Sequence, residues 1–184
     1  MNEKAGRLIL AVDPGTTKTA YVVYDKQTKA LEEFGKIPNA AFLKKIVEGD
    51  FVKRPDYMAI EMMASQGMAV GQSTFETAVW IGRYVQAWLV CPANQAKLDP
   101  PPYEFVYRLD EKMHLCANAR AKDPNIRQAI MDRYGSTQEA AVGKKHAPGP
   151  LYGVSSDVWA AIAIALVAAE VPEDRRCGHG GMQL

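Results

Sequence analysis

The apolar and polar positions of the first third of the chain predict three strands, a helix and a fourth strand. Apolar runs bounded by turn residues predict strands at residues 7–12, 19–24 and 30–37, which the turn DKQT helps to fold into an antiparallel meander. Apolar residues at helical spacing then predict a helix that Asn39 caps and that ends at Gly49. The apolar segment YMAIE, residues 57–61, predicts the fourth strand.

A long helix is predicted at residues 73–90, after a loop rich in Gly and Met. Ser73 and Glu76 have the spacing of a capping box at its start. Its apolar positions cover most of the circumference and leave Glu76, Arg83 and Gln86 on a narrow polar stripe. Because such a helix usually buries two faces, we expect one face on the sheet and the other on a partner subunit.

The remaining segments predict one more strand and two helices. YEFVYRL predicts a fifth strand at residues 103–109, and Asp123, Pro124 and Gly135 mark the ends of a following helix. Residues 136–153, with several Gly, Pro and Lys, predict a mobile loop, and the last helix runs from about 157 to 170. We expect a single domain over residues 1–170 and a disordered tail over 171–184.

This order of elements predicts an α/β protein with a ribonuclease H-like fold. In that fold a mixed five-stranded sheet, three antiparallel strands plus two parallel ones, is flanked by helices. The first and fourth strands are then parallel neighbours about 4.8 Å apart. Asp13 and Glu61 would stand side by side at the carboxyl edge, where open α/β sheets place their sites.

The composition is that of an ordinary soluble protein. The 184 residues are 48% hydrophobic and 23% charged, and the net charge of +1 does not by itself indicate a nucleic-acid partner. We see no signal peptide, and the longest apolar run is shorter than the roughly 20 residues of a membrane span. Three cysteines without a CxxC spacing suit a reducing, cytoplasmic compartment.

Three carboxylates carry the candidate chemistry. Singly, Asp13 could form a turn and Asp157 could cap a helix, whereas Glu61 ends an apolar strand that has little reason to carry an acid. Together they would repel one another unless a cation compensates them. Oxygen-only ligands favour Mg²⁺, with Mn²⁺ as a substitute, and such ions can activate water for phosphodiester cleavage. Gly15 would leave room for the phosphate.

Four motifs resemble those of the RuvC-type Holliday junction resolvases, especially their bacteriophage-like members. AVDPGTTKTAYVVYD resembles the first family motif and MAIEMM the second, while IGRYVQAWLV resembles the long dimer helix and SSDVWAAIAIALVAAE the final helix. The resemblance covers residues 8–169. It implies a homodimer, formed through residues 73–90, that nicks four-way DNA junctions symmetrically with Mg²⁺, in the cytoplasm of a bacterial or phage-infected cell.

The resemblance also implies roles for the acids. Asp13, Glu61 and Asp157 fall on acidic positions of the family pattern and would be the catalytic metal ligands. The family often carries a second acid or a His three residues after the position of Asp157, where this chain has Ala160. Either three carboxylates suffice here, or Ala160 inactivates the enzyme.

Basic and apolar residues supply candidate DNA contacts. In the family a lysine after the fifth strand approaches the scissile phosphate, which makes Lys122, or else Lys112, the candidate for a catalytic role. Arg127 and Arg133 fit a solvated helix face, and Met63 or Met68 could enter the junction at the crossover, although packing explains either equally well. The full set of expected DNA contacts is Lys18, Met68, Lys112, Arg120, Lys122, Lys144 and Lys145.

Three other functions remain open. The opening motif also resembles the phosphate motif of actin-like kinases and ATPases, but this chain lacks the second domain and the second glycine motif that they need. A ribonuclease that processes RNA would keep the fold and change the substrate. A junction-binding module without catalysis is the third alternative, which Ala160 favours.

Overall fold

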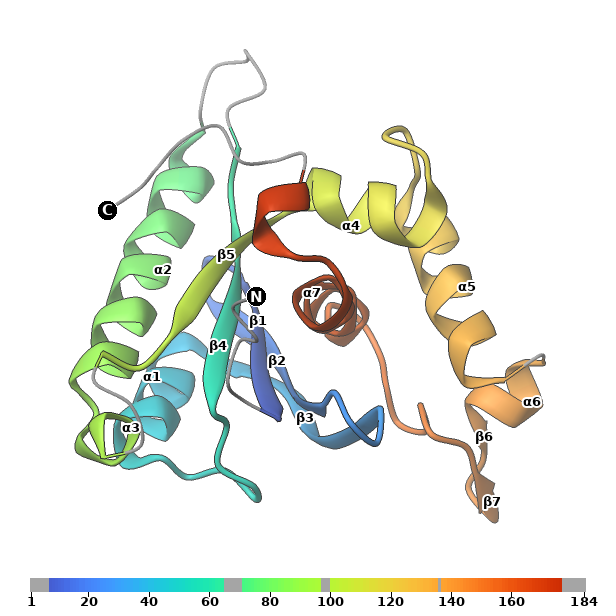
Figure 1. Cartoon of the computed structure of the whole chain (residues 1–184), viewed down its shortest axis with the longest axis horizontal. Helices are drawn as coiled ribbons and strands as arrows, with labels where there is room; N and C mark the ends of the chain where they lie inside the picture. The colour runs from blue at the N-terminus through green and yellow to red at the C-terminus, as the bar shows by residue number, and fades with distance from the viewer. Residues whose placement is uncertain (1–6, 65–70, 97–99, 136, 177–184) are drawn as a thin grey trace.

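The computed structural model describes residues 7–64, 71–96, 100–135 and 137–176, and its sheet has the predicted architecture (Figure 1). Five strands lie in the order β3-β2-β1-β4-β5. Strands β1, β2 and β3 are antiparallel neighbours, and β4 and β5 continue the sheet parallel to β1. The strands are β1 (Leu8–Pro14), β2 (Lys18–Asp25), β3 (Ala30–Pro38), β4 (Tyr57–Met62) and β5 (Tyr103–Tyr107). The α/β, ribonuclease H-like prediction is confirmed.

The turn between β2 and β3 is fixed by a buried carboxylate. Asp25 Oδ1 accepts hydrogen bonds from the backbone N–H groups of Gln27 (2.9 Å) and Thr28 (3.2 Å). Its Oδ2 accepts from Arg7 Nε at 2.7 Å. Both carboxylate oxygens of this buried acid have hydrogen-bond partners, so its role in shaping the turn explains why an Asp is buried here.

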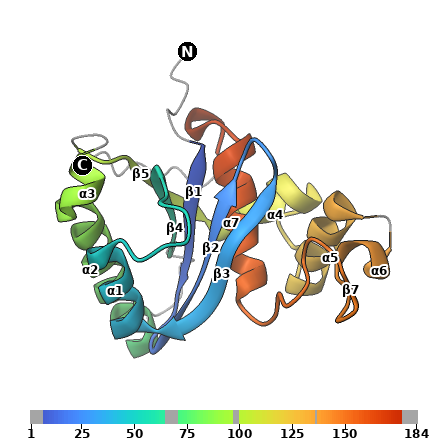
Figure 2. The ribbon, with the colours of Figure 1, turned by 90° about the horizontal axis from the view of Figure 1, so that it is seen from below.

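Helices cover both faces of the sheet (Figure 2). Helices α1 (Asn39–Glu48) and α2 (Gln72–Val90) pack on one face, and α7 (Val158–Glu170) packs on the other. The side chains of β1 alternate between the two layers: Leu10 and Val12 join the α1–α2 cluster, and Ile9 and Ala11 join the α7 cluster. This period of two follows from the pleat of a strand.

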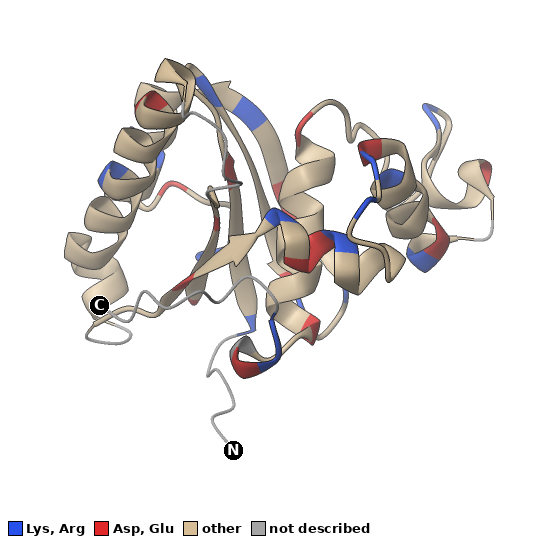
Figure 3. Cartoon of the chain, turned by 90° about the horizontal axis from the view of Figure 1, so that it is seen from above, with Lys and Arg blue, Asp and Glu red and all other residues tan. Residues whose placement is uncertain are grey.

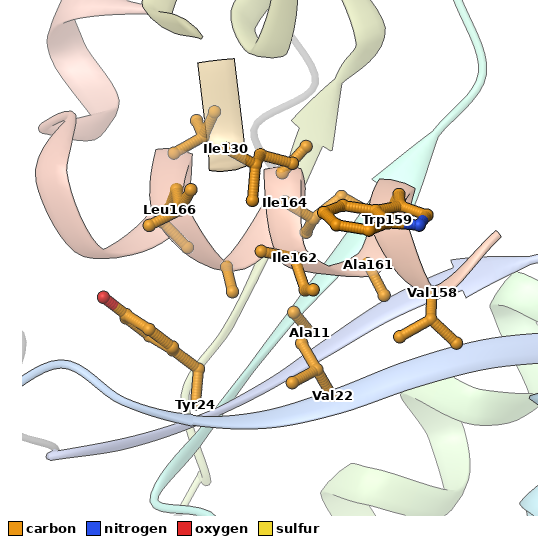
Figure 4. Packing of buried hydrophobic residues seen from close by; sticks show 14 of the residues in the cluster. Ala11, Val22, Tyr24, Ile130, Val158, Trp159, Ala161, Ile162, Ile164 and Leu166 are labelled. Atoms are coloured by element: carbon orange, nitrogen blue, oxygen red, sulfur yellow. The ribbon is translucent and has the colours of Figure 1, made fainter. Parts of the chain in front are cut away.

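Helix α7 is apolar around its whole circumference because it is covered on both sides. Val158 and Ile162 lie toward Ala11 and Val22 of the sheet, and Ile130 lies on the opposite side of α7 (Figure 4). Ile130 belongs to α5 (Asp123–Tyr134). The tight packing fixes the start of α7 against the sheet, which places Asp157 near the carboxyl ends of β1 and β4.

Asn39 does not cap α1, so that prediction was wrong. It is the first residue of α1, follows Pro38 at the cap position, and is buried. Its Oδ1 accepts from Thr19 Oγ1 at 2.8 Å, and its Nδ2 donates to the carbonyls of Gly15 (2.9 Å) and Thr16 (3.0 Å). Asn39 therefore ties down the turn that follows Asp13.

The other two predicted caps also differ from the structure. Gly71 is the N-cap of α2, and Glu76 accepts a hydrogen bond from Gln72 Nε2 at 2.7 Å instead of completing a capping box with Ser73. Lys122 holds the N-cap position of α5, so Asp123 is already the first helical residue. The N-cap lies two residues earlier than predicted in α2 and one residue earlier in α5, which is within the usual uncertainty of a helix end.

Helices α3 (Pro92–Gln95) and α4 (Arg108–Cys116), between α2 and α5, were not predicted. The short α3 follows α2, and α4 begins where we expected the fifth strand to continue. Strand β5 ends at Tyr107, whose backbone N–H donates to Asp110 Oδ2 at 3.3 Å. The buried Asp110 thus closes the first turn of α4, and the polar sequence RLDEK continues as helix.

The segment that we expected to be a loop contains defined elements. It holds α6 (Gln138–Ala141) and a small hairpin of β6 (Gly143–Lys144) and β7 (Ala147–Pro148). Thr137 Oγ1 accepts from the N–H of Ala140 at 3.1 Å and so caps α6. A Cβ on Gly143, which has φ of +72°, would lie 2.3 Å from the carbonyl oxygen of Ala147, so only glycine fits this turn.

The chain after α7 remains ordered as far as the description reaches. A 3-10 turn (Glu173–Arg175) leads to Arg176, which is buried, although we expected the tail to begin at residue 171. Arg176 Nη2 donates to Glu104 Oε1 of β5 at 3.0 Å. None of the described helices has the length and hydropathy to cross a membrane.

Candidate active site

Asp13 and Glu61 are neighbours at the carboxyl ends of parallel strands. The register of β1 and β4 pairs Val12 with Ile60, so the next residues in the two strands are the two acids. The turn that directly follows Asp13 is held in place by Asn39, whose Nδ2 donates to the carbonyl oxygen of Gly15. Gly15 has a structural reason for lacking a side chain, because a Cβ there would lie 2.6 Å from the carbonyl oxygen of Lys18. Space for a phosphate is therefore not needed to explain this glycine.

The environment of Asp13 opposes its ionisation. Burial, the charge of Glu61 and a hydrogen bond with Glu61 raise the pKa of Asp13 to about 8, and Asp157 adds a smaller repulsion. Asp13 therefore tends to keep its proton beside the carboxyl group of Glu61. A bound cation would compensate the charge and release the proton.

Asp157 faces the same cavity but has its own partner. Lys36 of β3 forms an ion pair with Asp157 Oδ2, and Ser156 Oγ donates to Asp157 Oδ1 at 3.0 Å. The hydrogen bond from Lys36 is the main reason that the pKa of Asp157 lies below its usual range. Asp157 occupies the N-cap position of α7 without a capping hydrogen bond from its side chain. The helix-cap explanation therefore does not account for its carboxylate.

These three acids line one cavity of about 300 Å³. The cavity is also lined by Arg108 at the start of α4 and by Asp123 at the start of α5. The rest of the lining is Ile126, Ser156, Trp159 and Ala160. The cavity joins residues that are far apart in sequence at the edge where parallel strands end.

Arg108 and Glu111, on the first turn of α4, were missed as site residues by the sequence reasoning. Arg108 forms ion pairs with Glu111 Oε2 and with Asp123 Oδ1. Burial raises the pKa of Glu111 well above its ordinary value, and the charge of Glu61 acts in the same direction. A signal was present, because β5 is parallel to β4 and whatever follows it must start at the same edge.

The donor set fits a hard divalent cation at the Asp13–Glu61 pair. Within the described residues, no three acidic, histidine or cysteine side chains converge enough to hold a metal ion, and Asp157 pairs with Lys36 instead. Two adjacent half-buried carboxylates are nevertheless the kind of oxygen ligands that Mg²⁺ prefers. Asp13 and Glu61 would hold the ion, with Asp157 within the same cavity.

The predicted lysines lie around this cavity and do not line it. Lys122 is exposed and directly precedes Asp123, which does line the cavity. Lys112 is half-buried and lines a second cavity of about 550 Å³, which shares Glu61 and Arg108 with the first. Neither lysine is brought against the carboxylates by the described contacts.

The other predicted DNA contacts lie in three separate places. Lys18 is exposed at the start of β2, just beyond the turn that follows Asp13, and Arg120 is exposed between α4 and α5. Lys144 and Lys145 are exposed on the β6–β7 hairpin, which lies at one end of the molecule (Figure 1). Met68 lies outside the described residues, and Met63 is half-buried at the second cavity.

Comparison with known proteins extends the description of the fold. No protein-family model matches the chain. No curated protein matches its sequence. Among solved structures, RuvC of Thermus thermophilus in complex with a Holliday junction substrate is 18% identical, with a TM-score of 0.57 over 88% of this chain and 92% of that one. A second structure of Thermus thermophilus RuvC is also 18% identical, with a TM-score of 0.58 over 88% and 93% of the two chains. The chain therefore has a RuvC-like fold.

Proposed function

We propose that this protein is a metal-dependent endonuclease that resolves four-way and branched DNA junctions. The observation that carries the proposal is the adjacent pair of Asp13 and Glu61 at the carboxyl edge of a RuvC-like sheet. One solved structure with this fold is RuvC with a Holliday junction substrate, which supports the same substrate class here. The net charge of +1 does not by itself indicate a nucleic-acid partner, so the proposal is supported by the residues of the site.

The acids supply a cation site and the cavity supplies room for a phosphate. We propose that Asp13 and Glu61 bind Mg²⁺, or Mn²⁺ in its place, and that Asp157 completes the ligand set. When bound, the ion would activate a water and stabilise the leaving oxygen of a phosphodiester. Asp13 would give up its proton on binding, because the cation outweighs the burial and the repulsion from Glu61 that raise its pKa.

The basic residues outside the cavity are proposed to hold the DNA backbone. Lys122 is our candidate for contact with the scissile phosphate, since it adjoins the cavity through Asp123. Phosphate contacts of this kind position the duplex arms and weaken as salt rises. The remaining proposed contacts are Lys18, Met68, Lys112, Arg120, Lys144 and Lys145.

We also propose a homodimer formed through α2. The face toward the sheet buries Ile81, Tyr84 and Trp88, while Phe75 and Val79 are each 62% exposed on the outside. Helix α2 is almost free of charge along its length (Figure 3). Exposed large apolar side chains on a helix whose charged residues are Glu76 and Arg83 fit a partner of the same kind. Two active sites in such a dimer would then cut two strands of a symmetric junction.

In the decisive experiment, the protein is incubated with end-labelled four-way junction, linear duplex or RNA–DNA hybrid. Each incubation is repeated with Mg²⁺, with Mn²⁺ and with EDTA. We expect paired, ligatable nicks in the junction that require the metal and that Asp13→Asn abolishes. Asp132→Asn removes the same charge from an exposed position on α5 and should cut normally. Cleavage of hybrid or RNA with no action on the junction would contradict the proposal and favour the RNA-processing alternative.

The residue at position 160 tests whether the protein is an active nuclease or binds junctions without cutting them. It lines the cavity beside the three carboxylates, so an acid there would enlarge the ligand set. If the protein binds the junction without cutting, and Ala160→Asp restores metal-dependent nicking, the natural protein is a binding module. If the unchanged chain cuts, three carboxylates suffice.

A further inference from the structure

Arg108 is the basic side chain that lines the cavity of the three carboxylates. Among the described residues that line the 300 Å³ cavity, Arg108 alone is basic. Its side chain is 28% exposed, so Arg108 is neither fully enclosed nor fully open to solvent. The two ends of the guanidinium have different partners, one buried and one exposed.

The buried partner holds Arg108 in place. Glu111 is 0% exposed, and its Oε2 accepts a hydrogen bond from Nη1 of Arg108. Its other oxygen, Oε1, is buried and accepts no hydrogen bond from the described residues. Since a buried carboxylate with one oxygen unsatisfied contributes poorly to stability, its value lies in fixing the direction of Arg108.

The exposed partner is easily displaced. Asp123 Oδ1 accepts a hydrogen bond from Nη2 of Arg108, but the side chain of Asp123 is 86% exposed at the start of α5. An ion pair with so exposed a carboxylate adds little to stability, because water solvates the separated ions almost as well. A phosphate oxygen entering the cavity could therefore take the place of Asp123 at Nη2.

We propose that Arg108 is a catalytic residue that binds the scissile phosphate, with Glu111 as its positioning residue and Asp123 as a carboxylate that the phosphate displaces. A guanidinium suits this role because its planar fork can keep Glu111 on one nitrogen while it donates to phosphate with another. This inference rests on the proposed nuclease function. It assigns a phosphate contact to Arg108, which lines the cavity, whereas Lys112 and Lys122 do not line it.

The role of Arg108 follows from the charge that develops in the reaction. A water oxygen forms a bond to phosphorus, the bond from phosphorus to the leaving deoxyribose oxygen breaks with its electron pair, and a proton passes from the water side to the leaving oxygen. Arg108 remains protonated throughout and donates a hydrogen bond to a non-bridging oxygen. Removing one preorganised donor of this kind costs about 10²–10³-fold in rate.

The first test measures junction binding in EDTA, so that it does not depend on cleavage. Asp123→Asn removes the competing charge and should tighten binding of a four-way junction several-fold. The same substitution in an Arg108→Lys background should have no such effect, because a lysine paired with Glu111 has no fork left to offer. Equal tightening in both backgrounds would mean a general charge effect and would overturn the proposal.

The second test measures single-turnover nicking at saturating junction. Arg108→Met combined with Glu111→Leu replaces the pair by apolar side chains and so avoids a lone buried charge. We expect a loss of about 10²–10³-fold in rate with junction affinity changed far less. Arg133→Met is the matched control, since Arg133 is 32% exposed, pairs with Glu170 and lines a different cavity.

Positioning by Glu111 has its own readout. Glu111→Gln should slow nicking in the otherwise unchanged protein and have no further effect when Arg108 is Lys. An equal slowing in both would assign Glu111 a role independent of Arg108. If the apolar double variant does not fold, Arg108→Lys alone carries the rate test, because it keeps the charge beside Glu111.

The failure of this inference is distinguishable from failure of the proposed function. If the unchanged protein nicks junctions and the Arg108 variants do so at the same rate, Arg108 is not catalytic and the nuclease stands. If the unchanged protein cuts nothing, the nuclease proposal fails, and the binding test in EDTA still decides whether Arg108 contacts phosphate.

Discussion

At the scale of single residues, the proton on Asp13 links the site to the stability of the fold. The pKa of Asp13 is raised to about 8, whereas an exposed aspartate titrates near pH 4. Between these pH values the folded state binds the proton and the unfolded state does not. The free energy of unfolding of the metal-free protein should therefore fall as pH rises from about 4 to 8, by roughly 2–4 kcal/mol.

Urea unfolding in EDTA at pH 5 and pH 8 measures this slope. Asp13→Asn should be less sensitive to pH and more stable than the unchanged protein at pH 8, although Glu111, whose pKa is also raised, keeps part of the slope. Mg²⁺ should stabilise the unchanged protein at pH 8 and leave Asp13→Asn nearly unaffected. Parallel pH profiles for the two proteins would contradict the raised pKa.

The same residues show how far a sequence can locate a site. Asp13 and Glu61 were predictable because strand ends on neighbouring parallel strands must meet. Lys36 was not, since its pairing with Asp157 joins β3 to the start of α7 across 121 positions of the chain. Glu111 was hidden for another reason: its burial depends on how α4 packs, which no local pattern in RLDEK reveals.

At the scale of elements, α2 offers the clearest test of assembly. Val79 is exposed on the face turned away from the sheet, so Val79→Glu should leave the fold intact and weaken the proposed dimer. The reason is that a charge would be buried without a partner at the interface. Val52→Glu is the control, because Val52 is 76% exposed in the loop before β4. Sedimentation equilibrium would show a monomer for the first variant alone, and an unchanged mass for both would place the contact elsewhere.

Regular elements were predictable where burial imposes a period, and were missed where polar contacts start them. The strands and α7 follow from apolar runs that the two core layers require. Helix α4 follows an apolar strand without any break in the sequence, and it begins because Asp110 accepts the N–H of Tyr107. Likewise α6 and the β6–β7 hairpin depend on Thr137 and Gly143, single residues whose signals are weak within a segment rich in Gly and Pro.

At the scale of the whole molecule, the end of the described chain closes the sheet opposite the site. Arg176 lies beside β5, where its Nη1 is 3.0 Å from Glu104 Oε2 and both side chains are almost fully buried. Tyr57 of β4 donates to the same Glu104. Two strands and the segment after α7 are thus joined by one buried polar cluster.

This cluster predicts a loss of stability without a direct loss of chemistry. Arg176→Met leaves the buried Glu104 without its cation and should lower the free energy of unfolding by about 3 kcal/mol, because one partner of a buried pair is costly to remove. Arg175→Met, an exposed neighbour, should change it by less than about 0.5 kcal/mol. Adding Glu104→Gln to Arg176→Met should recover much of the loss, since the unpaired charge is gone. Urea unfolding measures all three; if Arg176→Met were as stable as Arg175→Met, the end of the chain would not be part of the cooperative fold, and the domain would end with α7.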